Sequence, residues 1–266
     1  MSSDTSLLIS AWTRPLYLKR VLASWAQVPE VKDLRTVTVA LGRSSRADEQ
    51  MAVIAAAQEE LGREITVRAD SDLAARSPGM HRALGEAASA AFADDPDLEF
   101  LVCSEEDVVV SDDVLRYFAW ARQLRDEHPE ILVCEAHNAF GQGWHPAGAV
   151  DDPDVDQAAV RLVSTFHPWT WATWRDRWEQ VLEPGWDWEC SKGTRGYDSG
   201  YDWTINYQMQ HGGYTAPAPD ASRSQNIGRY GGVYANPALF DSTQSQSFRP
   251  SRGDVSYRLA TPALTR

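Results

Sequence analysis

Apolar positions in the first half of the chain follow two alternating spacings. Short apolar runs typical of buried strands occupy residues 6–12, 36–41, 65–68 and 98–103. Segments with helical spacing separate these runs: one begins at Pro15 and carries Leu18, Val21, Leu22 and Trp25 on one face, and the others span residues 47–61 and 78–92. Strands that alternate with helices in this way predict an α/β fold with a mostly parallel sheet covered on both faces.

The pattern continues for one more unit and then changes. Ser111 or Asp112 is placed to cap a further helix, and residues 131–135 return as a strand. Beyond Asn138, Gly, Pro, Trp, Asp and Tyr become dense, and clear helical spacing is left to residues 175–182 and 201–211. We therefore expect a nucleotide-binding half over residues 1–137, a half that completes the cleft over 138–240, and an irregular tail over 241–266.

Composition excludes several classes of protein. The 266 residues carry a net charge of −13, which argues against a broad basic surface for nucleic acid or anionic lipid. No leader pattern and no apolar run long enough to span a bilayer is visible, and the three cysteines show no pairing pattern. We expect reduced thiols and a cytoplasmic location. Eleven tryptophans, nine of them after Ser111, suit either a large core or a cleft for planar ligands.

Three consecutive carboxylates, Glu105, Glu106 and Asp107, follow the apolar run that ends at Cys103. Like charges at neighbouring positions repel, and partial burial at a strand end makes the arrangement costly unless a cation offsets it. In open α/β sheets, ligands bind beyond the carboxyl ends of the strands. Hard oxygen ligands at that place suit Mg²⁺ or Mn²⁺ on a diphosphate, whereas the simpler interpretation is a solvated acidic turn.

The stretch EFLVCSEEDVVVSDDVLRYF resembles the acidic metal motif of GT-A fold glycosyltransferases, and the chain looks most like their N-acetylglucosaminyltransferase I type. The resemblance implies a metal-dependent, inverting glycosyltransferase that uses Mn²⁺ or Mg²⁺ and a nucleotide-sugar donor, such as a UDP-sugar. It makes Asp107 the direct metal ligand, with Glu105 and Glu106 reaching the ribose or metal-bound water. The family's uracil-contacting Asp has no counterpart in VALGRSSRAD.

Further donor-binding residues are implied by segments that resemble the family in the same order. LLISAWTRPLYLKRVLASW places Arg14 against the diphosphate, SPGMHRALGEAASAAF brings His81 towards the donor, and FHPWTWATWRDRW makes Trp169 and Trp171 walls of the sugar pocket. APDASRSQNIGRYGGVY resembles a loop that closes over the donor. Its implied contacts are Ser222, Arg223, Asn226, Gly228 and Arg229.

Inverting transfer to a hydroxyl also requires a base within hydrogen-bond reach of the acceptor oxygen. The family places an Asp directly before a Trp at a helix start, which corresponds to Asp202 in GYDWTINYQMQ. Asp187 and Asp198 are rivals, because an Asp that opens a helix is often its cap. The sequence leaves the acceptor open among a glycan, a protein, a small molecule and a modified nucleic-acid base.

Two other functions compete with glycosyl transfer. The chain could be a non-catalytic carbohydrate-binding protein that keeps a degenerate transferase fold and uses its tryptophans as sugar platforms. A nucleotidyltransferase also joins an α/β sheet to acidic metal ligands, but SAWTRPLYLKR lacks the glycines of a phosphate-binding loop after the first strand.

Overall fold

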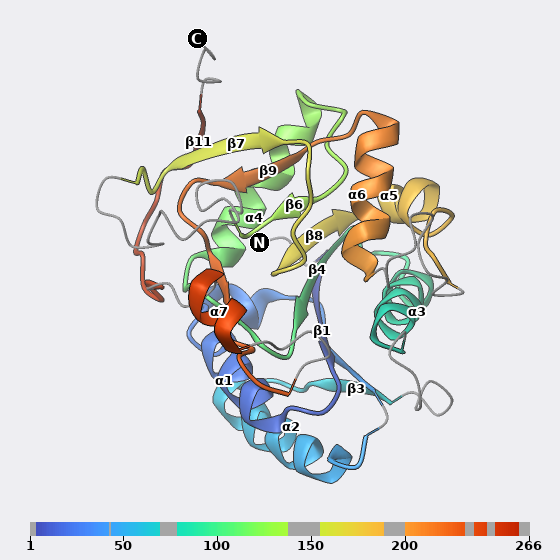
Figure 1. Cartoon of the computed structure of the whole chain (residues 1–266), viewed down its shortest axis with the longest axis vertical. Helices are drawn as coiled ribbons and strands as arrows, with labels where there is room; N and C mark the ends of the chain where they lie inside the picture. Colours follow the sequence, from blue (N-terminus) through green and yellow to red (C-terminus); the bar gives the residue numbers. More distant parts are fainter. Residues whose placement is uncertain are drawn as a thin grey trace.

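A mostly parallel sheet forms the centre of the molecule (Figure 1). The computed structural model describes residues 4–42, 44–69, 79–137, 155–188, 200–231, 237–243 and 248–260. Within these residues the central sheet has the order β3-β2-β1-β4-β8-β6. Its strands are β1 Thr5–Ala11, β2 Val37–Leu41, β3 Thr66–Ala69, β4 Phe100–Glu105, β6 Cys134–Glu135 and β8 Trp171–Trp174. β1 to β4 run parallel, whereas β8 is antiparallel to both of its neighbours.

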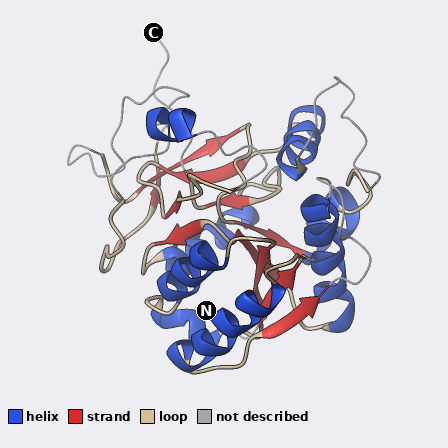
Figure 2. Cartoon of the chain, turned by 60° about the horizontal axis from the view of Figure 1, so that its bottom comes forward, coloured by secondary structure: helices blue, strands red, loops and turns tan. Residues whose placement is uncertain are grey.

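Helices cover both faces of this sheet, because successive side chains of a strand point to opposite faces. In β1, Leu7 and Ile9 pack with α1, α2 and α4, while Leu8 packs with α3 and α6. Figures 1 and 2 show the sheet enclosed in this way. The helices are α1 Pro15–Trp25, α2 Ala47–Leu61, α3 Gly79–Asp94, α4 Val114–Ala121, α5 Arg175–Arg177, α6 Tyr201–Gly212 and α7 Pro237–Thr243, with η1 Pro29–Asp33, η2 Arg122–Asp126 and η3 Trp178–Leu182.

The α/β fold class predicted from the sequence is confirmed, and α2 has the predicted limits. β4 lies two residues later than expected, so Glu105 closes the strand instead of following it. The predicted cap of α4 is wrong, because Asp113 occupies the N-cap position and Ser111 donates its hydroxyl hydrogen bond to the Asp113 carboxylate. Asp112 instead accepts hydrogen bonds from Ser251 and from the Arg252 backbone.

Two small sheets complete the second half of the chain. β7 Ala159–Val163 lies between β9 Ala216–Pro219 and β11 Arg258–Leu259, and β10 Ser224–Asn226 pairs antiparallel with β5 Val108–Val110. The β5–β10 pair brings the segment around Asn226 to the end of β4, more than a hundred residues away in the sequence. It thereby links the acidic triplet to the predicted donor loop.

The described C-terminal residues, 248–260, have little regular secondary structure and are hydrogen-bonded to the rest of the fold. Arg223 is fully buried, and its Nε donates to Asp113 Oδ2 at 2.8 Å. The Tyr257 hydroxyl donates to the same carboxylate at 2.7 Å, and Arg252 Nη2 donates to the Ser222 carbonyl at 2.9 Å. The tail therefore holds the start of the loop that leads to Asn226.

Within the described ranges, the helices and the cysteines bear on the membrane and thiol expectations. None of the helices there combines the length and the apolar character that crossing a membrane requires. Cys103 and Cys134 are buried free thiols, and Cys190 lies outside the described residues.

Candidate functional site

Arg14 joins two of the three consecutive carboxylates where β1 and β4 end. Its Nε lies 2.8 Å from Glu106 Oε1, and its Nη1 lies 2.8 Å from Asp107 Oδ2. β1 is flanked by β2 on one side and by β4 on the other, so this pair of strand ends is the point where the strand order reverses. Ligands of open α/β sheets bind at such a switch point.

Glu106 anchors the turn between β1 and α1. Its Oε2 accepts hydrogen bonds from the Trp12 backbone N–H at 2.8 Å and from the Arg14 backbone N–H at 3.2 Å. Its Oε1 accepts from the Thr13 N–H at 3.4 Å. The sequence could not distinguish this anchor from a ligand-facing acid, since both are a carboxylate at a strand end. The structure directs Glu106 to the backbone, where it fixes the position of Arg14.

Asp107 is buried against the predicted donor loop. Its carbonyl accepts a hydrogen bond from the Ile227 N–H at 2.7 Å, and Asn226 Nδ2 lies 3.4 Å from its Oδ2. Its other carboxylate oxygen, Oδ1, is buried without a hydrogen-bond partner. Burial raises the pKa of Asp107, and the nearby Arg14 opposes that shift. The structure thus brings together Arg14, Asp107 and Asn226, three of the candidate site residues.

Gly228 lies directly against the Arg14–Asp107 pair. A Cβ at position 228 would lie 1.9 Å from Asp107 Oδ2 and 3.0 Å from Arg14 Nη1. No side chain fits there without displacing the ion pair, so the loop backbone lies directly on it. Gly231, with φ of 75°, also approaches the Arg14 side chain.

Glu105 faces α6 on the other side of the triplet. The Tyr201 hydroxyl donates a hydrogen bond to Glu105 Oε1 at 2.9 Å and lies 3.3 Å from the Pro168 carbonyl. Burial, followed by the charge of Asp107, raises the pKa of Glu105 to about 8. Tyr201 was not among the predicted site residues, although its position directly before Asp202 was visible in the sequence.

Asp202 lies in the first turn of α6, half-buried and close enough to Glu105 for the two carboxylates to repel. Burial raises the pKa of Asp202, and the backbone N–H of Trp203 opposes the rise. A raised pKa makes a carboxylate a better proton acceptor near neutral pH. Of its predicted rivals, Asp187 follows Trp186 near His81, and Asp198 lies outside the described residues.

The segment before β8 forms hydrogen bonds with both the strand ends and α6. Thr170 has φ of 65°, which is strained for a β-branched residue. Its hydroxyl lies 2.9 Å from that of Ser104, and the Ala136 N–H donates to its carbonyl at 2.9 Å. Asn206 of α6 exchanges two hydrogen bonds with the Phe166 backbone. The strain at Thr170 could not be predicted from the sequence, because its φ is set by tertiary contacts.

The remaining predicted residues lie around this centre or away from it. Trp169 is half-buried with its ring 4.4 Å from that of His137, whereas Trp171 is fully buried in the core. Arg229 pairs with Asp241 of α7 through its Nε at 2.7 Å. The structure does not bring Ser222 and Arg223 to the Arg14–Asp107 pair, because both are buried at the opposite end of β10 from Asn226.

His81 lies inside an aromatic cluster on the α3 side. Its ring centroid is 4.9 Å from that of Trp186 and 6.4 Å from that of Tyr201. Burial lowers its pKa to about 4, so the ring is neutral at pH 7. Through Tyr201, the cluster reaches Glu105. Within the described residues, no recorded contact joins His81 itself to the acidic triplet.

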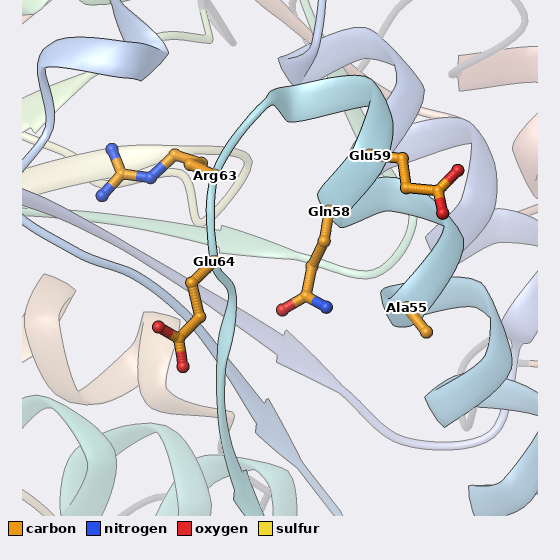
Figure 3. A pocket seen from close by; sticks show the side chains of 5 residues that line it. All are labelled: Ala55, Gln58, Glu59, Arg63 and Glu64. Atoms are coloured by element: carbon orange, nitrogen blue, oxygen red, sulfur yellow. The ribbon is translucent and has the colours of Figure 1, made fainter.

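The pocket in Figure 3 lies away from this site, at the end of the sheet where β3 begins. Its lining residues are Ala55, Gln58, Glu59, Arg63 and Glu64. Arg63 Nη1 donates to the Val31 carbonyl, and Gln58 Oε1 accepts from the Ile65 N–H. These polar groups hold the backbone in place, which makes the hollow a structural feature.

The acidic centre suits a divalent cation bound largely by substrate oxygens. Within the described ranges, no three His, Cys, Asp or Glu side chains gather in a metal-binding arrangement. Mg²⁺ sites that hold phosphates commonly use one or two protein carboxylates. The Asp107 Oδ1 atom, which has no hydrogen-bond partner, and the crowding of Glu105, Asp107 and Asp202 fit such an ion, because these carboxylates repel one another and a cation would relieve the repulsion.

Comparison with known proteins supports the fold. No family model and no curated protein matches the sequence. Among solved structures, the mannosyltransferase PcManGT from Pyrobaculum calidifontis, in complex with GDP-Man and Mn²⁺, is 16% identical over 82% of this chain, with a TM-score of 0.53. TarS residues 1–349 from S. aureus is 12% identical over 84% of this chain, with a TM-score of 0.50. The chain spans 55% and 59% of the lengths of those proteins.

Proposed function

We propose that the chain is a GT-A-like glycosyltransferase that moves a sugar from a nucleotide-sugar donor to a hydroxyl acceptor. The observation that carries the proposal is the pair of half-buried Arg14 and buried Asp107 against the Asn226–Gly228 turn, at the switch point of the sheet. The fold shared with a mannosyltransferase in complex with GDP-Man and Mn²⁺ supports it. The N-acetylglucosaminyltransferase I type remains an expectation from sequence.

The donor diphosphate is assigned to Arg14. A guanidinium can bind two phosphate oxygens at once, and Glu106 already holds this side chain through its Nε. Asn226 and the Gly228 backbone lie over the same place. A divalent cation held by Asp107 would offset the charge of the departing diphosphate.

Asp202 is assigned the role of base. Its carboxylate would accept the proton of the acceptor hydroxyl as that oxygen attacks the sugar carbon, on the face opposite the departing diphosphate. This geometry inverts the configuration at that carbon. Glu105, held by Tyr201, is close enough to both Asp202 and Asp107 to be repelled by their charges, and we assign it to the donor sugar or ribose side of the cleft.

The proposed activity is tested by incubating the protein with a panel of UDP-, GDP-, dTDP- and ADP-sugars, with and without Mn²⁺, and measuring the release of nucleoside diphosphate. Many glycosyltransferases hydrolyse their donor slowly when water replaces the acceptor, so we expect release from one donor class that depends on the metal. Release from none of the donors under either condition would favour the alternative of a non-catalytic carbohydrate-binding protein.

Gly228→Ala is expected to weaken donor binding. The added methyl group would overlap Asp107 Oδ2 and crowd Arg14, and overpacking of this kind typically costs about 1–3 kcal/mol of stability. Gly62→Ala is the control: its Cβ meets nothing within 4 Å, but its φ of 64° makes the substitution cost about 1–2 kcal/mol. Melting temperature and donor affinity are measured for both variants. Equal donor affinity in both would show that the turn does not lie on the donor.

A further inference from the structure

Two large aromatic side chains are exposed on one face of α6. The exposed fractions of Trp203 and Tyr207 are 56% and 49%. The opposite face of the helix is buried through Tyr201, Ile205 and Met209, which pack into the core. The exposed rings therefore contribute little to the packing of α6, and their exposure is a cost that a function would explain.

The exposed rings follow the helix axis in a regular row. Trp203, Tyr207 and His211 are spaced four residues apart, which places successive side chains about 6 Å apart along the axis. The Tyr207 and His211 rings are stacked with centroids 3.8 Å apart, and His211 Nδ1 lies 2.8 Å from the Tyr207 carbonyl. This end of the row is therefore held in place before any ligand binds. We call these three residues the α6 aromatic row.

The row begins beside the proposed base. Trp203 directly follows Asp202, and Asn206 fixes this turn of α6 to the segment before β8 through its two hydrogen bonds with Phe166. A ligand that lies along the row would thus extend one end towards Asp202. Asp202 neighbours Glu105, the acid of the triplet that faces α6, whereas Arg14 pairs with Glu106 and Asp107.

The chemistry of the row favours a neutral ligand. α6 contains no Lys or Arg, and the chain carries a net charge of −13, so a polyanion would find no counter-charge on this helix. Single-stranded nucleic acids are bound by aromatic rings together with a basic groove. The exposed Trp203 ring, with no cation on its helix, instead suits the C–H face of a sugar ring, and the exposed side of the stacked Tyr207–His211 pair is placed to contact a linked sugar.

We propose that the α6 aromatic row binds a neutral carbohydrate chain and presents its end to Asp202 as the acceptor. The role of the carbohydrate as acceptor rests on the proposed glycosyl transfer. The binding of a carbohydrate chain rests only on the residues of the α6 aromatic row. Trp203 contributes the platform nearest to the reacting end, and Tyr207 with His211 holds the sugar units further along the chain.

Affinity electrophoresis tests the binding without any donor. Wild-type protein, Trp203→Ala, Trp203→Phe and Tyr207→Ala are run through native gels that contain soluble glucan, mannan, galactan, xylan or arabinan. Met51→Ala, which changes an exposed side chain of α2, is the matched control, and circular dichroism checks that each variant is folded. The same proteins are mixed with a single-stranded oligonucleotide to test the competing class of ligand.

We expect at least one polysaccharide to retard the wild-type protein. Trp203→Ala and Tyr207→Ala should each weaken that binding about tenfold, whereas Trp203→Phe and Met51→Ala should retain most of it. The proposal is overturned if no polysaccharide retards the wild type, if the row variants bind as tightly as the wild type, or if the row binds the oligonucleotide instead. Because no donor is present, these outcomes are independent of whether the protein turns over a nucleotide sugar.

Discussion

Asp202→Asn is expected to lower the rate of sugar transfer by about 10² to 10⁴-fold, because removal of a positioned general base has an effect of this size. The substitution keeps the shape of the side chain and removes the carboxylate that would accept the acceptor proton. Donor affinity should change little, because the residues proposed to bind the donor diphosphate and the metal are Arg14 and Asp107.

If Asp202 only stabilises the start of α6, a different result is expected. The carboxylate lies in the first turn of α6, whose N-cap is Gly200, and a negative charge at that place typically stabilises a helix by about 0.3–1 kcal/mol. In that case the melting temperature would fall while kcat stayed near its wild-type value. Asp187→Asn is the matched control, because Asp187 is the rival acid that the structure describes. If transfer is lost in Asp187→Asn and kept in Asp202→Asn, the base is Asp187.

The first half of the fold was predictable because its strands and helices carry strong, separate periodicities. α1 and α2 follow the apolar spacing of their sequences. β1 and β2 begin and end within one residue of their expected limits. β8 was not predicted, because WATW lies in a stretch rich in Trp and Pro where neither spacing dominates. It becomes a strand by pairing with β4 and β6, and such pairing is not visible locally.

The candidate site was predictable in its residue types but not in the direction of each side chain. Glu105, Glu106 and Asp107 look alike in the sequence, yet they face Tyr201, the turn after β1, and Arg14 with Asn226, respectively. Consecutive side chains near a strand end point to different sides, so neighbours acquire different partners.

The same limit applies to the two arginines of the predicted donor loop. Arg223 and Arg229 both belong to the segment that resembles a donor-closing loop, and the resemblance implied that both contact the donor. In the structure, Arg223 is buried with Asp113, which lies 110 residues away in the sequence, whereas Arg229 pairs at the surface with Asp241. A partner as distant in the sequence as Asp113 cannot be identified from a local pattern.

Asp107→Asn is expected to weaken metal-dependent donor binding by more than about 100-fold. Loss of an outer partner of a metal ligand typically costs 10 to 100-fold in affinity, and loss of the proposed ligand itself should exceed that range. The variant keeps the shape of the side chain and its contact with Asn226, but it removes the charge that pairs with Arg14. Glu106→Gln is the control, since Glu106 binds backbone N–H groups and its loss should lower stability without abolishing the effect of Mn²⁺.

The central claim is that the Arg14–Asp107 pair marks the nucleotide-sugar site. It is tested most directly by calorimetric titration of the donor identified in the panel into the wild-type protein and into Asp107→Asn, each with and without Mn²⁺. We predict that Mn²⁺ strengthens donor binding to the wild type and has no effect on the variant. An equal gain in affinity on adding Mn²⁺ to both proteins would contradict the claim and place the metal and the donor elsewhere.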